Sequence, residues 1–241
     1  DVGVDKDIAG YTSFNSRIGN DYSNIMSQIS QICQEPFVEL YTDTYGDRFH
    51  IMARRPPFDY TAVKFWSESK TTRVINESDI LSDSLDYDER AFSWYKMDIR
   101  FLSAAFDANF RWLFPAKHFK EYEDIFGDKP YQVENPYINH EMAESNDPSA
   151  VLLGKRMINA GIADFKYIIE CNAYLPFTRT GSITINGDRV YKRGTWIKHE
   201  GTSELFYIDN VSHTMGVSET TEWTTTLSVS RGMHLKYLSK Y

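Results

Sequence analysis

Hydroxyl side chains alternate with apolar ones near the end of the sequence, in the stretch WTTTLSVSRG. A nucleophilic Ser or Thr needs a base within hydrogen-bond reach and an oxyanion donor, whereas a period-two row of hydroxyls is typical of the water-facing side of a sheet. We therefore interpret this stretch as a structural strand, and Arg231 with Gly232 as a bulge or bend at its exit. The two faces are Thr224, Thr226, Ser228 and Ser230 on one side and Thr225, Leu227 and Val229 on the other.

Two patterns could bind a metal ion. Residues 140–144 read HEMAE, which resembles the zinc-protease signature, but Glu144 stands where the second His is required. His199, Asp209 and His213 could approach one another across neighbouring strands. Strand His and Asp residues are more often solvated or satisfied locally, so we expect no metal site. The remaining candidates have no recognisable partner spacing: His50, His118 and His234.

Paired carboxylates could supply the acid and base of a glycosidase, as in Asp43 with Asp47 or Glu121 with Asp124. The chain holds 34 Asp and Glu residues, so such pairs arise by chance, and we interpret them as a solvated turn and a solvated helix face. The sequence contains no glycine-rich phosphate loop, GxSxG elbow or CxxC motif. We predict no catalytic, cofactor-binding or metal-ligating residues and no enzyme activity. A small surface basic patch comprises Arg189, Lys192 and Arg193.

Composition predicts a globular chain that can bury a core: 241 residues, 41% hydrophobic and 15% aromatic. The net charge of -8 and a pI near 5.3 argue against a nucleic-acid clamp, which needs clustered Lys and Arg. Cys33 and Cys171 exclude a disulfide framework; one bridge is possible, but free thiols are the expectation. No apolar run is long enough to predict membrane insertion. The chain begins at Asp1 rather than Met, which allows an upstream domain.

The first third predicts a helix, a hairpin and a short strand. Three- and four-residue apolar spacings indicate a helix over Ser13–Cys33, ended by Pro36. Two runs of β-forming residues around TYGD predict a hairpin of Val38–Thr44 with Arg48–Arg54. A further strand is expected at Ala62–Trp66.

The middle third, residues 74–165, is predicted to be a mainly helical insertion. It has a capped turn at Glu77–Leu81, a helix over Phe114–Gly127, an extended loop at DKPYQVENPYIN, and a helix from Pro148 to about Asn159 with a break at Gly161. Its aromatic residues are either contacts with neighbouring chains or an internal core. These are Trp94, Tyr95, Phe101, Phe106, Phe110, Trp112 and Phe114.

The last third changes to a period of two, and its turns predict a small antiparallel barrel or sandwich. The expected strands are Tyr167–Pro176, Gly181–Gly187, Arg189–Glu200, Glu204–His213 and Glu222–Gly232. We expect the hairpin to supply missing strands, which makes the fold mainly β with a helical insertion (α+β), and the barrel discontinuous in sequence. The predicted domains are a helix and linker over 1–36, a barrel over 37–73 and 166–241, and the insertion over 74–165.

Several segments, in this order, resemble the tail hub proteins of bacteriophages. That family has the contractile-tail baseplate hub as its type member and is related to late-control proteins and to the hub part of type VI secretion spikes. The segments cover nearly the whole chain, and their order and spacing are more specific than any one alone. They are a helix running into PFVELYTDTYGDRFHIMARRPPFD, then INESDILSDSLDYDERAFSWY, KRMINAGI, GSITINGDRVYKRGTWI, ELFYIDNVSHTM and TTTLSVSRGM.

The resemblance implies a tube-type β-barrel module that assembles as a ring, usually a homotrimer, around a central channel. Such a hub joins the tail tube protein to a spike or tail-tip protein, and genomic DNA only passes through it. The implied location is the virion tail or baseplate, after assembly in the host cytoplasm. Complete hubs of this family usually carry two similar barrels per chain. Since one barrel is predicted here, either an upstream barrel is missing or the chain is a reduced homologue.

Two other functions remain open from the sequence. A carbohydrate- or receptor-binding tail module is one, because 16 Tyr and 5 Trp residues offer rings that stack on sugars. A tail-associated cell-wall hydrolase is the other. Mass in solution with tail partners, glycan binding by a monomer, and peptidoglycan turnover lost on one carboxylate change would distinguish the three.

Overall fold

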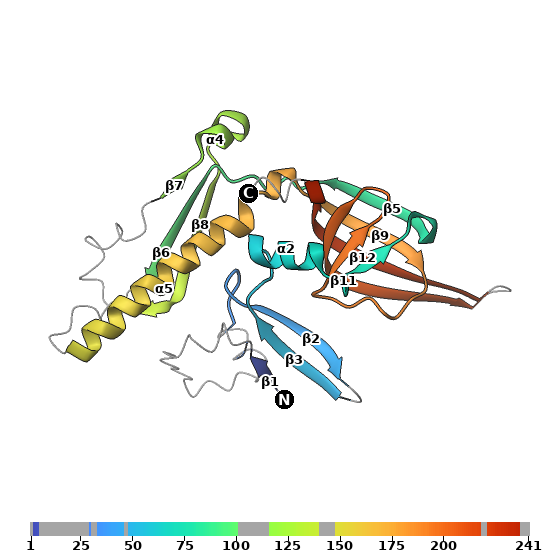
Figure 1. Ribbon diagram of the computed structural model, residues 1–241, viewed down its shortest axis with the longest axis horizontal. Coiled ribbons are helices and arrows are strands. Elements are labelled where there is room, and N and C mark those ends of the chain that lie inside the picture. Colours follow the sequence, from blue (N-terminus) through green and yellow to red (C-terminus); the bar gives the residue numbers. More distant parts are fainter. Residues whose placement is uncertain are drawn as a thin grey trace.

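The computed structural model describes residues 2–4, 29, 33–45, 48–100, 116–139, 148–217 and 221–236. The protein is mostly β, with 45% strand and 28% helix, and its largest sheet curls into a half-barrel. Two smaller sheets and two longer helices lie beside it (Figure 1). The predicted mainly-β fold with helices is therefore confirmed. Of the helix predicted over Ser13–Cys33, all but Ile29 and Cys33 lies outside the described residues.

The curled sheet has six strands in the order β4-β10-β11-β12-β9-β5. Neighbours are antiparallel except for β4 and β10, which are parallel. The strands predicted from Gly181, Glu204 and Glu222 are confirmed, but the one predicted over Arg189–Glu200 is reduced to its last part. The strands are β4 (Arg73–Ile75), β5 (Ile80–Tyr87), β9 (Arg179–Asn186), β10 (Trp196–His199), β11 (Glu204–Val217) and β12 (Thr221–His234).

The curl of this sheet follows from its connectivity. β4 and β5 lie at opposite edges, yet only residues 76–79, including the short 3-10 turn η1 (Glu77–Asp79), separate them in sequence. A link this short reaches at most about 18 Å, whereas about 24 Å separates the edge strands of a flat six-stranded sheet, so the sheet has to bend until its edges approach each other. Segment 73–87 therefore pairs on one side through its beginning and on the other side through its end.

The concave side of the sheet contains an aliphatic core. Leu227 and Val229 of β12 are buried there with Ile183 and Ile185 of β9 and with Phe206 of β11. The alternation predicted for the last strand is thus confirmed, and burying these branched side chains stabilises the curl through removal of apolar surface from water.

The hairpin predicted before the first Pro pair is confirmed as β2 (Glu39–Tyr45) and β3 (Arg48–Arg54). Its expected role in the barrel is wrong: β3 pairs instead with β1 (Val2–Val4), in a separate three-stranded sheet. The physical reason is that side-chain contacts rather than ladder hydrogen bonds hold the hairpin against the curled sheet, as in Arg54 donating to the Tyr207 hydroxyl. The predicted turn at Gly46 and Asp47 lies outside the described residues.

The strand predicted at Ala62–Trp66 is wrong, because these residues belong to helix α2 (Tyr60–Glu68). Asp59 caps its start by accepting a hydrogen bond from the backbone of Ala62 at 2.7 Å. One face then buries Val63 against the end of the curled sheet, so the cap and this contact outweigh the β propensity of the aromatic residues.

Residues 74–165 hold strands as well as helices, unlike the mainly helical content predicted. Besides β5, the segment contains β6 (Trp94–Arg100), β7 (Lys117–His118) and β8 (Pro130–Asn139), which form a sheet in the order β7-β6-β8, and helix α4 (Lys120–Phe126). α4 begins later than predicted and ends at Gly127, as expected. The expected domain boundaries themselves stay a prediction.

The expected loop DKPYQVENPYIN is instead β8. Pro130 and Pro136 argued against a ladder, but β8 is an edge strand, where a missing amide donor is tolerated. Pro136 lies at a register shift between β8 and β6, after Asn135 pairs with Ile99.

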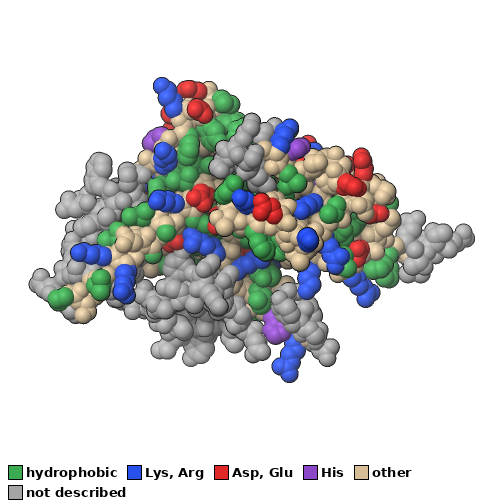
Figure 2. All heavy atoms as spheres, in the orientation of Figure 1, with side chains coloured by type: hydrophobic (Ala, Val, Ile, Leu, Met, Phe, Trp, Pro, Cys, Tyr) green, Lys and Arg blue, Asp and Glu red, His purple; other side chains and the backbone are tan. Residues whose placement is uncertain are grey.

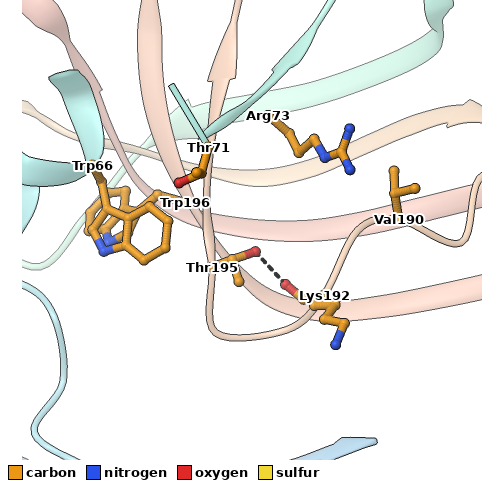
Figure 3. A pocket seen from close by; sticks show the side chains of 7 residues that line it. All are labelled: Trp66, Thr71, Arg73, Val190, Lys192, Thr195 and Trp196. Carbon is orange, nitrogen blue, oxygen red and sulfur yellow. Dashed lines mark hydrogen bonds between the residues drawn. The ribbon is translucent and has the colours of Figure 1, made fainter. Parts of the chain in front are cut away.

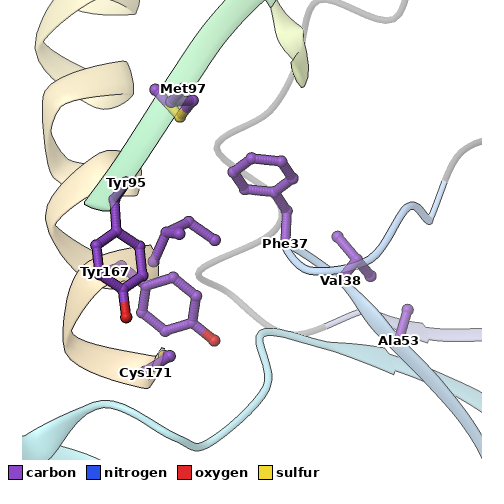
Figure 4. Packing of buried hydrophobic residues seen from close by; sticks show 8 residues of the cluster. Phe37, Val38, Ala53, Tyr95, Met97, Tyr167 and Cys171 are labelled. Carbon is purple, nitrogen blue, oxygen red and sulfur yellow. The ribbon is translucent and has the colours of Figure 1, made fainter. Parts of the chain in front are cut away.

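Helix α5 (Pro148–Asn172) begins at Pro148 as predicted but runs far beyond Asn159. It passes through Gly161, which costs only about 1 kcal/mol inside a helix. Most of Tyr167–Pro176 also belongs to α5, so the strand predicted there is wrong. Tyr167 and Cys171 pack on β6 and on the base of the hairpin (Figure 4), and this packing outweighs local propensity.

Gly181 permits the close pairing of β9 with the edge strand β5. Its φ is +153°, and a Cβ atom there would lie 1.9 Å from the carbonyl oxygen of Ser84. We predict that Gly181→Ala lowers the free energy of unfolding by more than about 2 kcal/mol and accelerates amide hydrogen exchange in β5. Gly127→Ala is the control, because nothing lies within 4 Å of its Cβ, and it should cost about 1 kcal/mol. Equal effects of the two changes would contradict the assignment.

Candidate functional site

The outer edge of β5 is exposed along most of its length. Within the described residues no strand pairs with that edge. Leu81 is 54% exposed and Tyr87 is 71% exposed, while Asp83 and Asp86 add charge along the same strand. Unpaired strand edges offer backbone donors and acceptors to another chain, and charged side chains limit indiscriminate pairing. This edge is therefore a candidate interaction surface.

Uncharged polar side chains form in-register rows on the face opposite the aliphatic core. All of them are half-buried or exposed, and none carries a formal charge. Thr184 and Thr226 share a hydrogen bond of 3.1 Å between their hydroxyls. The sequence analysis identified only the hydroxyl side chains of β12, whereas the strand register shows which residues of β5, β9 and β11 lie beside them. The rows are Ser84, Ser182, Ser228 and Asn210; then Ser82, Thr184, Thr226 and Ser212; then Asn186, Thr224 and Thr214.

A buried arginine joins the curled sheet to the helical side of the molecule. Arg231 interrupts β12 with a φ of 57° and is 8% exposed. Its guanidinium lies 3.8 Å from the ring centroid of Phe58 and donates hydrogen bonds to the backbone oxygen of Cys171 and, at 3.3 Å, to the hydroxyl of Tyr174. The register shift between Val229 and Gly232 confirms the bulge predicted at this point.

A second polar cluster joins the hairpin to the sheet. Arg54 Nε lies 3.1 Å from Glu39 Oε2, and its Nη2 donates to the Tyr207 hydroxyl at 2.8 Å and to the Gly194 oxygen at 2.5 Å. Tyr207 in turn donates to Glu39. Burial, and then the charge of Glu39, raise the pKa of Tyr207, so its phenol stays protonated and keeps this donor.

Two further ion pairs involve carboxylates whose pKa is lowered. Burial alone would raise the pKa of Glu204, but hydrogen bonds from Arg179 outweigh it and hold the pKa below its usual range. Asp88 behaves alike: burial opposes ionisation, but Arg90 lowers its pKa through side-chain and backbone hydrogen bonds. These groups bind arginines tightly and are charged at neutral pH.

The histidines considered as metal ligands have local partners instead. His199 Nδ1 accepts from the Thr202 backbone at 3.2 Å, and His213 Nδ1 is 2.9 Å from the hydroxyl of Thr225. Asp209 lies at a register shift of β11. Among the described residues no cluster of His, Cys, Asp and Glu is arranged to hold a metal. His118 stacks on Trp94, and residues 140–144 lie outside the described parts.

The remaining candidates are dispersed. Glu121 and Asp124 are exposed on α4, and Asp47 lies outside the described residues. Of the aromatic residues predicted as contacts or core, Tyr95 is fully buried and Trp94 donates to Asp128, whereas Phe101, Phe106, Phe110, Trp112 and Phe114 are outside the described residues. Figure 2 shows hydrophobic side chains gathered around α4 and charges of both signs interspersed elsewhere on this face.

The basic patch predicted in the loop before β10 does not act as a unit. Arg189 lies over the Trp223 ring, 5.4 Å from its centroid, and Arg193 is exposed. Lys192 lines a pocket of about 200 Å³ together with Arg73, Trp66 and other residues (Figure 3). Sequence reasoning missed this pocket because its walls come from segments more than 100 residues apart.

Comparisons with protein-family models and with curated proteins find no match for this chain. Among the described helices, none has the length and apolar character needed to cross a membrane. Cys33 and Cys171 are both free thiols, in line with the expectation from the sequence.

Replacing Arg231 tests the junction between sheet and helix. We predict that Arg231→Met lowers the free energy of unfolding by about 2–4 kcal/mol, because it leaves a buried carbonyl oxygen unpaired and removes the stacked cation. Urea unfolding measures the change, with exposed Arg193→Met as the control expected within about 0.5 kcal/mol of wild type. An unchanged free energy of unfolding in Arg231→Met would contradict the role of Arg231 in joining the sheet to the helix.

The lowered pKa of Glu204 predicts a defined response to acid. The pair with Arg179 stabilises the fold above the unfolded-state pKa of Glu204, and this contribution disappears as pH falls through the lower folded-state value. Arg179→Gln removes the partner while burial remains, so the midpoint of acid unfolding should move to higher pH. Circular dichroism at 222 nm against pH measures it. Lys64→Gln, an equal charge change on an exposed helix position, should leave the midpoint in place.

Proposed function

We propose that this chain is a structural component of a phage tail, a hub that forms a ring around the tail channel. In that role it joins the tail tube protein to a spike or tail-tip protein during DNA delivery. The observation that carries the proposal is the exposed outer edge of β5 on a curled, mostly antiparallel sheet. The order of segments that resemble tail hub proteins supports the same conclusion.

Self-association gives the β5 edge a partner. A curled sheet with an unpaired edge is stabilised when a second copy covers that edge, and repetition of such a head-to-tail contact closes into a ring when the rotation permits. Leu81 and Tyr87 provide apolar area for the contact. In the proposed assembly, a homotrimeric ring, copies of the half-barrel complete a tube-type wall.

The rows of uncharged polar side chains suit a surface past which DNA moves. Lys and Arg would bind phosphates and displace counterions, whereas Ser, Thr and Asn provide hydration without fixed charge. Thr184, Thr226 and Ser228 belong to these rows. We propose that this face of the sheet borders the channel of the assembled ring.

Substitution at the β5 edge tests the proposed assembly. The double variant Leu81→Lys with Tyr87→Lys should stay folded but lose self-association, because two added cations per edge oppose burial. Light scattering after size separation, with and without the tail tube and spike proteins, measures the mass. Ile125→Lys is the matched control, since Ile125 is 70% exposed but lies on α4.

Electron microscopy of the intact particle provides the decisive observation. The expected image has density for this chain as a ring on the tail axis, and the wild-type mass matches a closed oligomer with its neighbours present. A chain that stays monomeric with those neighbours, and is absent from the axis, would refute the proposal.

A further inference from the structure

A small pocket beside the edge strand β4 combines aromatic, cationic and hydroxyl groups. Its volume is about 200 Å³, and it lies where α2, the turn after it and the loop before β10 meet. Figure 3 shows the two indole rings on one side and Arg73, Val190 and Lys192 on the other. The lining residues are Trp66, Thr71, Arg73, Val190, Lys192, Thr195 and Trp196.

The indoles form a fixed wall. Trp66 packs against the buried cluster that contains Trp196, and the Trp66 backbone oxygen accepts a hydrogen bond from Thr72 at 2.6 Å. Trp196 is 1% exposed, and its Nε1 is a buried donor with no hydrogen-bond partner among the described residues. Buried donors are nearly always satisfied, so an internal water is the expected partner of this one. The Trp196 ring itself lines the pocket.

The cations lie at the accessible side of the pocket. Arg73 and Lys192 are both exposed, and Arg73 forms no ion pair with a described carboxylate. A guanidinium and an ammonium on one rim favour a carboxylate or another small anion. In a chain with a net charge of -8, this is a local reversal of sign.

The hydroxyls favour a ligand that also donates hydrogen bonds. Thr195 Oγ1 donates to the Lys192 backbone oxygen at 2.7 Å, which leaves its lone pairs to accept from a ligand. A bare anion would use only donors. The volume equals the space of roughly six or seven liquid waters, which suits one six-membered ring rather than a larger ligand.

We propose that this pocket binds a single acidic sugar residue, a hexuronic acid unit of a glycan. The ring stacks on the Trp66 face, the carboxylate pairs with Arg73 and Lys192, and a ring hydroxyl donates to Thr195 Oγ1. This site is independent of ring formation, so the isolated chain suffices to test it, and its failure leaves the hub proposal untouched.

Titration with methyl β-D-glucuronide, followed by the indole N–H signals in nuclear magnetic resonance, tests the site. The Trp196 signal should shift saturably, with a dissociation constant on the order of 1 mM. Methyl β-D-glucoside, which lacks the charge, and acetate, which lacks the ring, should each bind at least about tenfold more weakly.

Matched variants locate the binding. Arg73→Gln and Trp66→Ala should each weaken glucuronide binding about tenfold, whereas Arg193→Gln and Ile125→Ala, at exposed positions outside the pocket, should not. Because Arg73 is exposed, Arg73→Gln should leave the protein folded. It therefore tests the site even if Trp66→Ala does not fold. A Trp196 signal that does not move, acetate binding as tightly as the glucuronide, or full affinity in Arg73→Gln would each overturn the proposal.

Discussion

Burial of the Arg231 guanidinium is the constraint on which the arrangement of the molecule depends. The side chain leaves β12 at a bulge, lies on the ring of Phe58 and donates to Cys171 at the end of α5 and to Tyr174 just after it. Three segments far apart in sequence thereby share one cation. A buried charge requires its partners, so none of these segments can move away without leaving it unsatisfied. The Glu39–Arg54 pair fixes the hairpin in the same manner.

The contacts that hold the helices and the hairpin lie away from β5, so that side of the sheet is free to bind other chains. Arg54 and Arg231 hold the hairpin and α5 at one end of the curled sheet, Val63 packs α2 there, and the aliphatic core fills the concave side. The outer edge of β5 and the uncharged rows take no part in either. A proposed hub and a proposed glycan pocket therefore use different surfaces, with Arg73 at the β4 edge and Leu81 on β5.

The sequence predicted those elements whose formation depends on residues close together in the chain. The hairpin, the strands from Gly181 onward and the start of α5 at Pro148 all follow from turn residues, alternation or a cap. Prediction failed where distant contacts decided: Tyr167 is helical because of its packing on β6, and β8 forms despite its prolines because it is an edge strand. The pocket and the role of Arg231 depend on residues brought together only by the fold, so spacing alone held no signal for them.

The pairing of Ile80 with Ile185 has a consequence for synthesis in the cell. β5 leaves the ribosome about 100 residues before β9, and translation at roughly 5–20 residues per second makes that a delay on the order of 5–20 s. During this interval the nascent chain presents a strand whose described pairing partner, β9, is not yet made. Asp83 and Asp86 within that strand oppose aggregation of adjacent nascent chains. The charges that limit contacts of the folded β5 edge therefore also keep the unfinished chain from aggregating.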